Sequence, residues 1–385
     1  MSAITVGGDL VHYEVLGRGG RPVILIHGWI GSWRYWIPTM RQLQMKFRVY
    51  AIDLFGFGDS GKNPSKYPIA QQVAMLDEFM KQLGLTKAAI LAHGLGTQIA
   101  IEYAKLYPDR IARMLLSSAP LFDPGDLDTR VPAGKRVLLT PDSKQLKPLN
   151  IPKPATQPTV NPTATPGAVT QVSRPVAPSG DIHIGGGEAD DPAKAKTVAS
   201  TSRETIPNPN VIDREKLRQA AMARMAEVEK KEETAAAATP VIKDNPLKTA
   251  LGSDTEALLV RCFKKSDTEY EKFQADVVKA DNKVLEHTAT GFDAGSFLDS
   301  IRMLPMPVVL IHGGDDPVVT PPGDAIWDYL TADKDEDALL PVPMESIKHF
   351  PMLESDNFQR LVGMFLEMPQ ISKIELKERW RRRSR

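Results

Sequence analysis

The stretch from Lys87 to Ala104, KAAILAHGLGTQIAIEYA, has the pattern of a turn that carries a catalytic nucleophile. Ala88–Ala92 is a short apolar run, as expected of a strand buried on both faces, and Gln98–Ala104 has apolar residues at helical spacing. Small residues bracket the sharp turn between them, which is the arrangement called a nucleophile elbow. The apex needs Ser, Cys or Asp to attack an ester or a C–X bond. Here the apex is Gly94, so the attacking atom is missing.

The composition limits the classes of partner and compartment. The 385 residues are 42% hydrophobic and 25% charged, and the formal net charge is zero. A neutral chain has no overall field to attract nucleic acid, so we expect no nucleic-acid partner. The single cysteine, Cys262, excludes an internal disulfide framework and suits a reducing compartment. Since no secretory signal pattern and no window of about 18 apolar residues occurs, we expect a cytoplasmic protein without stable membrane insertion.

Strand and helix patterns alternate in both end regions of the chain. Apolar runs typical of strands lie at 4–16, 22–26, 48–52, 88–92, 111–117, 307–311 and 338–344. Helical patterns lie at about 32–44, 69–83, 322–330 and 355–366. This alternation predicts an α/β protein, whose mostly parallel sheet is covered by helices on both faces.

Five sequence blocks resemble the α/β-hydrolase superfamily, in particular its branch of epoxide hydrolases, haloalkane dehalogenases and small esterases. They are HGW at 27–29, DLFGFGDSG at 53–61, AHGLGT at 92–97, HGGDDPVVTP at 312–321 and KHFPMLES at 348–355. The resemblance covers about 1–121 and 305–368. It implies an α/β-hydrolase fold, with a mostly parallel eight-stranded sheet, helices on both faces and a helical cap.

The resemblance and the composition together divide the chain into five parts. The expected parts are a first core segment (1–122), a Pro/Ala/Thr-rich insertion (123–212), a helical cap (213–304), a second core segment (305–368) and a basic tail (369–385). The insertion lacks Phe, Tyr and Trp, so it has too few large apolar groups to offset the entropy of ordering itself. We therefore expect it to be disordered, and to be the segment through which a protein partner would bind. The strongest helix of the cap is expected at 214–238, which is rich in Ala, Glu, Lys and Met.

Hydrolysis on this scaffold also needs a histidine that moves the nucleophile's proton and an acid that holds the histidine. The resemblance implies His349 as the histidine and Asp316 as the acid, with Asp315 as the alternative if the register differs by one. The expected oxyanion donors are the N–H of Leu95, at a helix N-terminus, and the N–H of Trp29. The resemblance implies no metal and no other cofactor.

Several residues near these motifs have simpler structural interpretations. We expect Asp59 and Ser60 to bond loop backbone and Ser32 to cap a helix. We expect the side chain of His93 to point away from the reaction centre. Three aromatic side chains either wall an apolar pocket or fill the core: Trp29, Trp33 and Trp36.

The glycine at position 94 separates three hypotheses about function. The first is a non-hydrolytic relative that binds a small apolar or ester-like ligand, or that serves as a platform for a partner. The second is an enzyme without a covalent nucleophile, in which His349 and Asp316 act as a general base, as in lyases or cofactor-free oxygenases on this fold. The third is an ordinary ester or epoxide hydrolase, which requires Gly94 to be a mutation. We favour the first, because glycine relieves the strain of the apex once hydrolysis is no longer needed.

Overall fold

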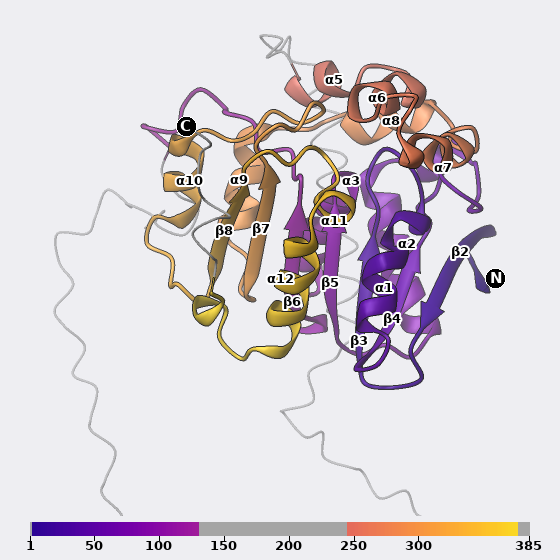
Figure 1. Ribbon diagram of the computed structural model, residues 1–385, viewed down its shortest axis with the longest axis horizontal. Coiled ribbons are helices and arrows are strands. Elements are labelled where there is room, and N and C mark those ends of the chain that lie inside the picture. Colours follow the sequence, from indigo (N-terminus) through magenta and orange to yellow (C-terminus); the bar gives the residue numbers. More distant parts are fainter. Residues whose placement is uncertain (1, 131–244, 376–385) are drawn as a thin grey trace, which may run out of the picture. The chain divides into compact units, whose positions relative to one another are not determined.

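The computed structural model describes residues 2–130 and 245–375 (Figure 1). These residues form one eight-stranded sheet in the order β1-β2-β4-β3-β5-β6-β7-β8. The strands are β1 (Ser2–Val6), β2 (Asp9–Leu16), β3 (Arg21–Ile26), β4 (Phe47–Ile52), β5 (Ala88–His93), β6 (Ile111–Ser117), β7 (Val308–Gly313) and β8 (Leu339–Met344). Neighbouring strands from β4 to β8 pair in parallel, whereas β2 is antiparallel to β1 and to β4. The prediction of a mostly parallel eight-stranded α/β-hydrolase sheet is confirmed.

The central strands owe their composition to burial on both faces. Every residue of β5 and β7 is buried, and so are the last four residues of β3. Parallel strands covered on both sides consist of nearly continuous apolar residues, which explains why the runs were visible in the sequence. The edge strand β8 contains Pro341 and Pro343, which are tolerated there because the strand has a neighbour on one side only.

The helices around the sheet fall into two groups by their contacts. In the first group, α1 (Ile37–Leu43) contacts both α11 (Pro351–Glu354) and α12 (Asp356–Glu367), and Figure 1 shows α1 and α12 in front of the sheet. In the second group, consecutive members contact each other in the order α2 (Ile69–Gln82), α3 (Leu95–Leu106), α9 (Ala294–Arg302) and α10 (Asp324–Thr331). Amphipathic spacing explains the packing of α12, whose buried residues Phe358, Leu361, Val362, Phe365 and Leu366 form one stripe.

Further helices occur in the long connection between β6 and β7. Those described are α5 (Pro246–Leu251), α6 (Thr255–Cys262), α7 (Thr268–Val277) and α8 (Lys283–Ala289). Figure 1 shows them beyond the carboxyl ends of the parallel strands. The same connection ends in α9, which lay inside the expected cap but contacts α3 and α10 around the sheet.

Part of the expected domain division lies outside the described residues. The described chain continues past 122 to Arg130, which forms ion pairs with Asp126 at 3.0 Å and Asp299 at 3.1 Å. The rest of the expected insertion, the helix predicted at 214–238 and most of the basic tail fall outside the described residues. None of the described helices is both long and apolar enough to cross a membrane. The cytoplasmic location stays a prediction.

Candidate functional site

The turn at Gly94 has the backbone conformation expected of an elbow apex. Strand β5 ends at His93, helix α3 begins at Leu95, and Gly94 between them has φ 50° and ψ −115°. Residues with side chains rarely adopt such angles, because they are strained there. A Cβ atom at Gly94 would lie 3.0 Å from Cε3 of Trp29 and 3.2 Å from Cα of Gly28. Glycine at the apex therefore avoids both backbone strain and a tight contact.

His349 and Asp316 form a buried hydrogen-bonded pair. Nδ1 of His349 lies 3.0 Å from Oδ1 and 2.9 Å from Oδ2 of Asp316. Oδ1 also accepts the N–H groups of Val318 and Val319, at 2.8 and 3.0 Å. Burial alone would raise the pKa of Asp316, but the neighbouring His349 ring and these hydrogen bonds outweigh it, so the pKa lies well below its ordinary value. Asp315 is exposed, so the structure brings Asp316 rather than Asp315 to the histidine.

The other ring nitrogen of His349 is buried and unpartnered. Because an ionised Asp316 can only accept, we assign the proton of His349 to Nδ1, which leaves a lone pair on Nε2. The His349 side chain is 0% exposed, and no described residue forms a hydrogen bond with Nε2. Buried polar atoms nearly always have a partner. This nitrogen is therefore suited to bind a group that comes from outside the chain.

Two backbone N–H groups beside the elbow have the properties of oxyanion donors. The loop and cap hydrogen bonds of the described residues use the N–H groups of Gly28, Gly96 and Thr97, but not those of Trp29 and Leu95. Leu95 is the first residue of α3, where the helix dipole favours negative charge. A carbonyl oxygen that reached both groups would be stabilised as it gained negative charge.

Aromatic rings lie close to His349, the histidine that pairs with Asp316. The ring centroids of Phe350 and His93 lie 5.1 and 4.6 Å from that of His349. Phe273 of α7 stacks on Tyr35 at 5.7 Å and contacts Phe350 at 4.7 Å. Because Phe273 belongs to the β6–β7 connection, this connection supplies part of the aromatic cluster beside the site.

The tryptophans that followed the HG pair in the sequence occupy different places. Trp29 and Trp36 are fully buried, and Trp33 is partly buried. The ring centroid of Trp36 lies 6.4 Å from that of Phe358 of α12, and Trp36 belongs to the core. Trp29 packs against Gly94, and its Nε1 atom is buried without a hydrogen-bond partner among the described residues. Of the two alternatives, the core position fits all three: Trp29 and Trp36 belong to the hydrophobic core, Trp33 packs against it, and Trp29 also lies beside the elbow.

His93 contacts the main chain of the loop that carries His349. Its side chain was expected to point away from the reaction centre, and its Nε2 atom lies 2.7 Å from the backbone carbonyl oxygen of His349. Its Nδ1 atom lies 2.9 Å from the hydroxyl of Tyr35. Burial lowers the pKa of His93 well below its ordinary value, so the ring is neutral. The sequence contained no local signal for this contact, since the partners are distant along the chain.

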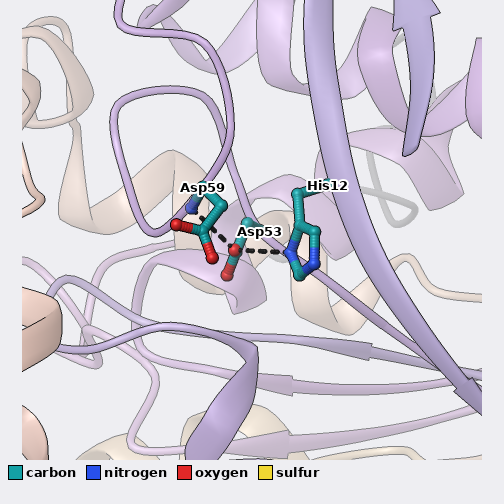
Figure 2. A group of neighbouring side chains, drawn as sticks. All are labelled: His12, Asp53 and Asp59. Carbon is teal, nitrogen blue, oxygen red and sulfur yellow. Dashed lines mark hydrogen bonds and ion pairs between the residues drawn. The ribbon is translucent and has the colours of Figure 1, made fainter. Parts of the chain in front are cut away.

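A second polar cluster holds the glycine-rich loop after β4. Figure 2 shows His12, Asp53 and Asp59 together: Oδ2 of Asp53 lies 2.9 Å from Nδ1 of His12 and accepts the N–H of Asp59 at 3.0 Å. Three such groups close together are also a possible metal site. The Asp59 carboxylate, however, is already paired with Lys279 at 2.7 Å and Arg34 at 3.3 Å. Since these cations balance its charge, we interpret the cluster as structural.

The expected roles of two serines are confirmed, and that of Asp59 is corrected. Ser60 donates to the carbonyl of Asp53 at 2.7 Å, and Ser32 caps the 3₁₀ helix at 33–36 by accepting the N–H of Arg34 at 3.3 Å. Ser32 also donates to Asp276 of α7 at 2.6 Å. The Asp59 carboxylate was expected to bond loop backbone but forms the two ion pairs instead, because a cation from the β6–β7 connection lies within reach.

Comparison with known proteins agrees with the fold. Residues 21–136 match the family model of the alpha/beta hydrolase fold. Epoxide hydrolase 4 of Mus musculus is 30% identical over 112 residues, which are 28% of this chain and 31% of that relative. The chain thus matches less than a third of the length of this relative.

Solved structures extend the comparison to nearly the whole chain. A serine-to-glycine mutant of the N-acyl homoserine lactonase AidH, complexed with N-hexanoyl homoserine lactone, has a TM-score of 0.52 at 15% identity, covering 95% of this chain and 96% of that chain. The enol-lactonase of Burkholderia xenovorans LB400 has a TM-score of 0.52 at 16% identity, covering 95% and 99%. At these identities the likeness shows the fold. Fold, family model and relatives agree, and the chain belongs to the α/β-hydrolase superfamily.

Proposed function

We propose that this protein binds a small apolar ester or lactone at the elbow and forms no covalent intermediate with it. The observation that carries the proposal is Gly94, which occupies the apex, while the preceding residue His93 bonds to the carbonyl of His349, the partner of Asp316. Covalent hydrolysis requires a nucleophile at this position. Removing one member of such a triad leaves only about 10³–10⁴-fold acceleration over water.

The groups around the elbow support this class of ligand. The N–H groups of Trp29 and Leu95 suit a carbonyl oxygen, and Nε2 of His349 suits a donor on the ligand or on a water that accompanies it. The aromatic cluster around His349 suits an apolar substituent. The serine-to-glycine lactonase mutant complexed with N-hexanoyl homoserine lactone supports the proposal, because that protein has the same fold and holds a lactone.

The helices α5–α8 would then act as the cap of this site. Two contacts support a cap at this position. Phe273 of α7 stacks on Tyr35, and Asp276 of α7 accepts from Ser32 and pairs with Arg34 at 2.9 Å. The role of the Pro-rich insertion in binding a protein partner stays a prediction, because most of that segment lies outside the described residues.

A specific observation favours a second candidate function. A protein that only binds a ligand does not need an oriented, buried histidine–carboxylate pair, yet Asp316 holds His349 with its free nitrogen unpartnered. A histidine held through Nδ1 with its Nε2 unpartnered has the geometry of a general base. The second candidate is therefore proton abstraction from a bound substrate or water without a covalent step, as in a lyase or a cofactor-free oxygenase.

Ligand titration combined with a turnover assay tests both candidates. N-hexanoyl homoserine lactone and phenyl acetate would be titrated into the wild type, His349→Gln and the control His287→Gln, whose histidine lies on α8. We expect a saturable rise in melting temperature, worth about 2.7 kcal/mol at a hundred times Kd, in the wild type and the control, with the ligand recovered unchanged. Turnover that His349→Gln abolishes would support the second candidate. If no probe shifts the melting temperature and none is turned over, the ester or lactone proposal is overturned.

A further inference from the structure

We propose that Tyr35 and His93 are positioning residues. Through a chain of three hydrogen bonds, they hold the turn at Gly28 and Trp29 at a fixed distance from the loop that carries His349. The chain begins at the N–H of Gly28, which lies 2.6 Å from the hydroxyl oxygen of Tyr35. It continues from Tyr35 to Nδ1 of His93 at 2.9 Å, and from Nε2 of His93 to the carbonyl oxygen of His349 at 2.7 Å.

The direction of every bond follows from the groups at the two ends of the chain. A carbonyl oxygen can only accept a hydrogen bond, so Nε2 of His93 must carry a proton and donate it in the bond to the backbone carbonyl of His349. In a neutral ring Nδ1 must then accept, and the hydroxyl of Tyr35 donates to it. The N–H of Gly28 can only donate, and it occupies a lone pair of the same hydroxyl. One tautomer of His93 therefore satisfies all three bonds at once.

The surroundings of His93 are shaped around this arrangement. A Cβ atom at Gly28 would lie 2.8 Å from Nδ1 of His93, so a glycine is needed for the ring to come this close. Ser118 donates a second hydrogen bond to the carbonyl of His349 at 3.0 Å. The Tyr35 ring meets the His93 ring edge-on at 5.4 Å, and both side chains are buried.

The chain ends next to the groups that the proposed function uses. Gly28 immediately precedes Trp29, whose N–H is a proposed oxyanion donor, and the carbonyl at the other end belongs to His349 itself. Tyr35 and His93 touch no ligand in this arrangement. They act by fixing the distance between a donor on one loop and a base on another. This functional part of the inference rests on the proposed ligand binding, whereas the chain itself does not.

The arrangement depends on a neutral His93. Tyr35 bonds to the ring of His93 and His349 lies against it, while Asp316, the carboxylate of the group, and His27 interact with it through their charges. If Nδ1 of His93 carried a proton, its N–H and the O–H of Tyr35 would both be donors that face each other. The hydroxyl would have to rotate away, and its hydrogen would then have no acceptor. The burial that lowers the pKa of His93 keeps this state unpopulated near neutral pH.

Nuclear magnetic resonance of the histidine rings in the full-length protein tests the series of hydrogen bonds without any ligand. In the wild type we expect His93 to give the ¹⁵N pattern of a neutral ring protonated at Nε2, unchanged between pH 8 and pH 6. The variant Tyr35→Phe keeps the aromatic ring but removes the link. The control Tyr103→Phe removes the hydroxyl of another fully buried tyrosine, for which no hydrogen-bond partner occurs among the described residues.

The two variants separate positioning from mere stabilisation. We expect Tyr35→Phe to shift the ring resonances of both His93 and His349, and Tyr103→Phe to leave them in place. Where a probe lactone binds the wild type, Tyr35→Phe should weaken its Kd about five- to tenfold, because the hydroxyl that links Gly28 to His93 is lost. A His93 ring protonated at Nδ1 in the wild type would overturn the chain, even if Tyr35→Phe failed to fold. His349 resonances that do not respond to Tyr35→Phe would overturn the positioning role, whatever the ligand titrations show.

Discussion

Adding a side chain at Gly94 should destabilise the protein for two separable reasons. The apex backbone, at φ 50°, strains any residue with a Cβ atom, at a cost of about 1–3 kcal/mol. The new Cβ would also stand 3.0 Å from the Trp29 indole, and overpacking of this kind costs about 1–3 kcal/mol. Gly94→Ala should therefore lower the free energy of unfolding by about 2–6 kcal/mol, a large share of the 5–15 kcal/mol typical of folded domains.

A double-mutant cycle separates the two contributions. Trp29→Leu removes the indole contact but leaves the backbone angle and the 3.2 Å approach to Cα of Gly28. Gly94→Ala should therefore cost less in that background than in the wild type, about 1–3 kcal/mol. Gly84→Ala is the matched control, because Gly84 has φ +66° but a Cβ there would meet nothing within 4 Å. Urea unfolding midpoints of the five proteins give the comparison. If Gly94→Ala costs no more than Gly84→Ala, the packing argument is refuted, and if it costs nothing, the turn is not a strained elbow.

The serine variant tests whether the rest of the site is intact. Gly94→Ser places a hydroxyl at the apex, directly before Leu95, and activity requires that this hydroxyl reach the unpartnered Nε2 of His349. We expect hydrolysis of p-nitrophenyl acetate above the wild-type rate, a further increase with Trp29→Leu, and loss of the gain with His349→Ala. A folded but inert Gly94→Ser/Trp29→Leu protein would show that the other groups are not arranged for hydrolysis, and would strengthen a binding or platform role.

Four further perturbations have definite expected outcomes. Burial lowers the pKa of His27, His93 and His312. Below about pH 6.5 these three imidazoles therefore bind protons in the unfolded chain but stay neutral in the folded protein. The free energy of unfolding, measured with urea, should then fall from pH 7 to pH 5 by up to about 1.4 kcal/mol per pH unit for each histidine. His12 has the opposite sign, because its hydrogen bond to Asp53 raises its pKa and its contribution is lost as the pH rises. His12→Asn should therefore cost more stability at pH 6 than at pH 9, and equal costs would contradict the pairing. Asp276→Asn should lower the unfolding free energy by about 1–3 kcal/mol, since Ser32 and Arg34 lose their carboxylate, whereas the exposed Asp128→Asn should change it little. Replacing residues 131–212 by a short Gly/Ser linker should move the melting temperature by only a few degrees, because loop closure changes by about 0.6 kcal/mol per doubling of length; a collapse of folding would show that these residues stabilise the core.

The parts of the site that the sequence could predict are those with a local or family pattern. Small residues around Gly94 predicted the tight turn, and a turn of this kind depends on its own few residues. The loop motifs placed Asp316 and His349 close together through the resemblance. The choice between Asp315 and Asp316 needed the structure, since adjacent loop residues differ only in which one turns inward.

The contacts between distant segments could not be predicted. The link from Tyr35 to His93 joins residues 58 positions apart, and the bond from Ser32 to Asp276 spans 244 positions. No periodicity encodes such pairs, because each side chain alone is compatible with a cap, a core or a surface position. The packing of Trp29 on Gly94 is of the same kind, and it changes the expected effect of Gly94→Ser from a simple restoration to one that must also move an indole.

The pairing of β6 with β7 also has a consequence for synthesis on the ribosome. Ser117 is in register with Ile311, so strand β6 emerges about 190 residues before its neighbour exists. At about 5–20 residues per second this interval lasts about 10–40 s. During that time Met114, Leu115 and Leu116 form the open edge of an unfinished sheet, a site prone to pair with other nascent chains. The length of the segment between the two strands thus sets how long this edge of the sheet stays unpaired during synthesis.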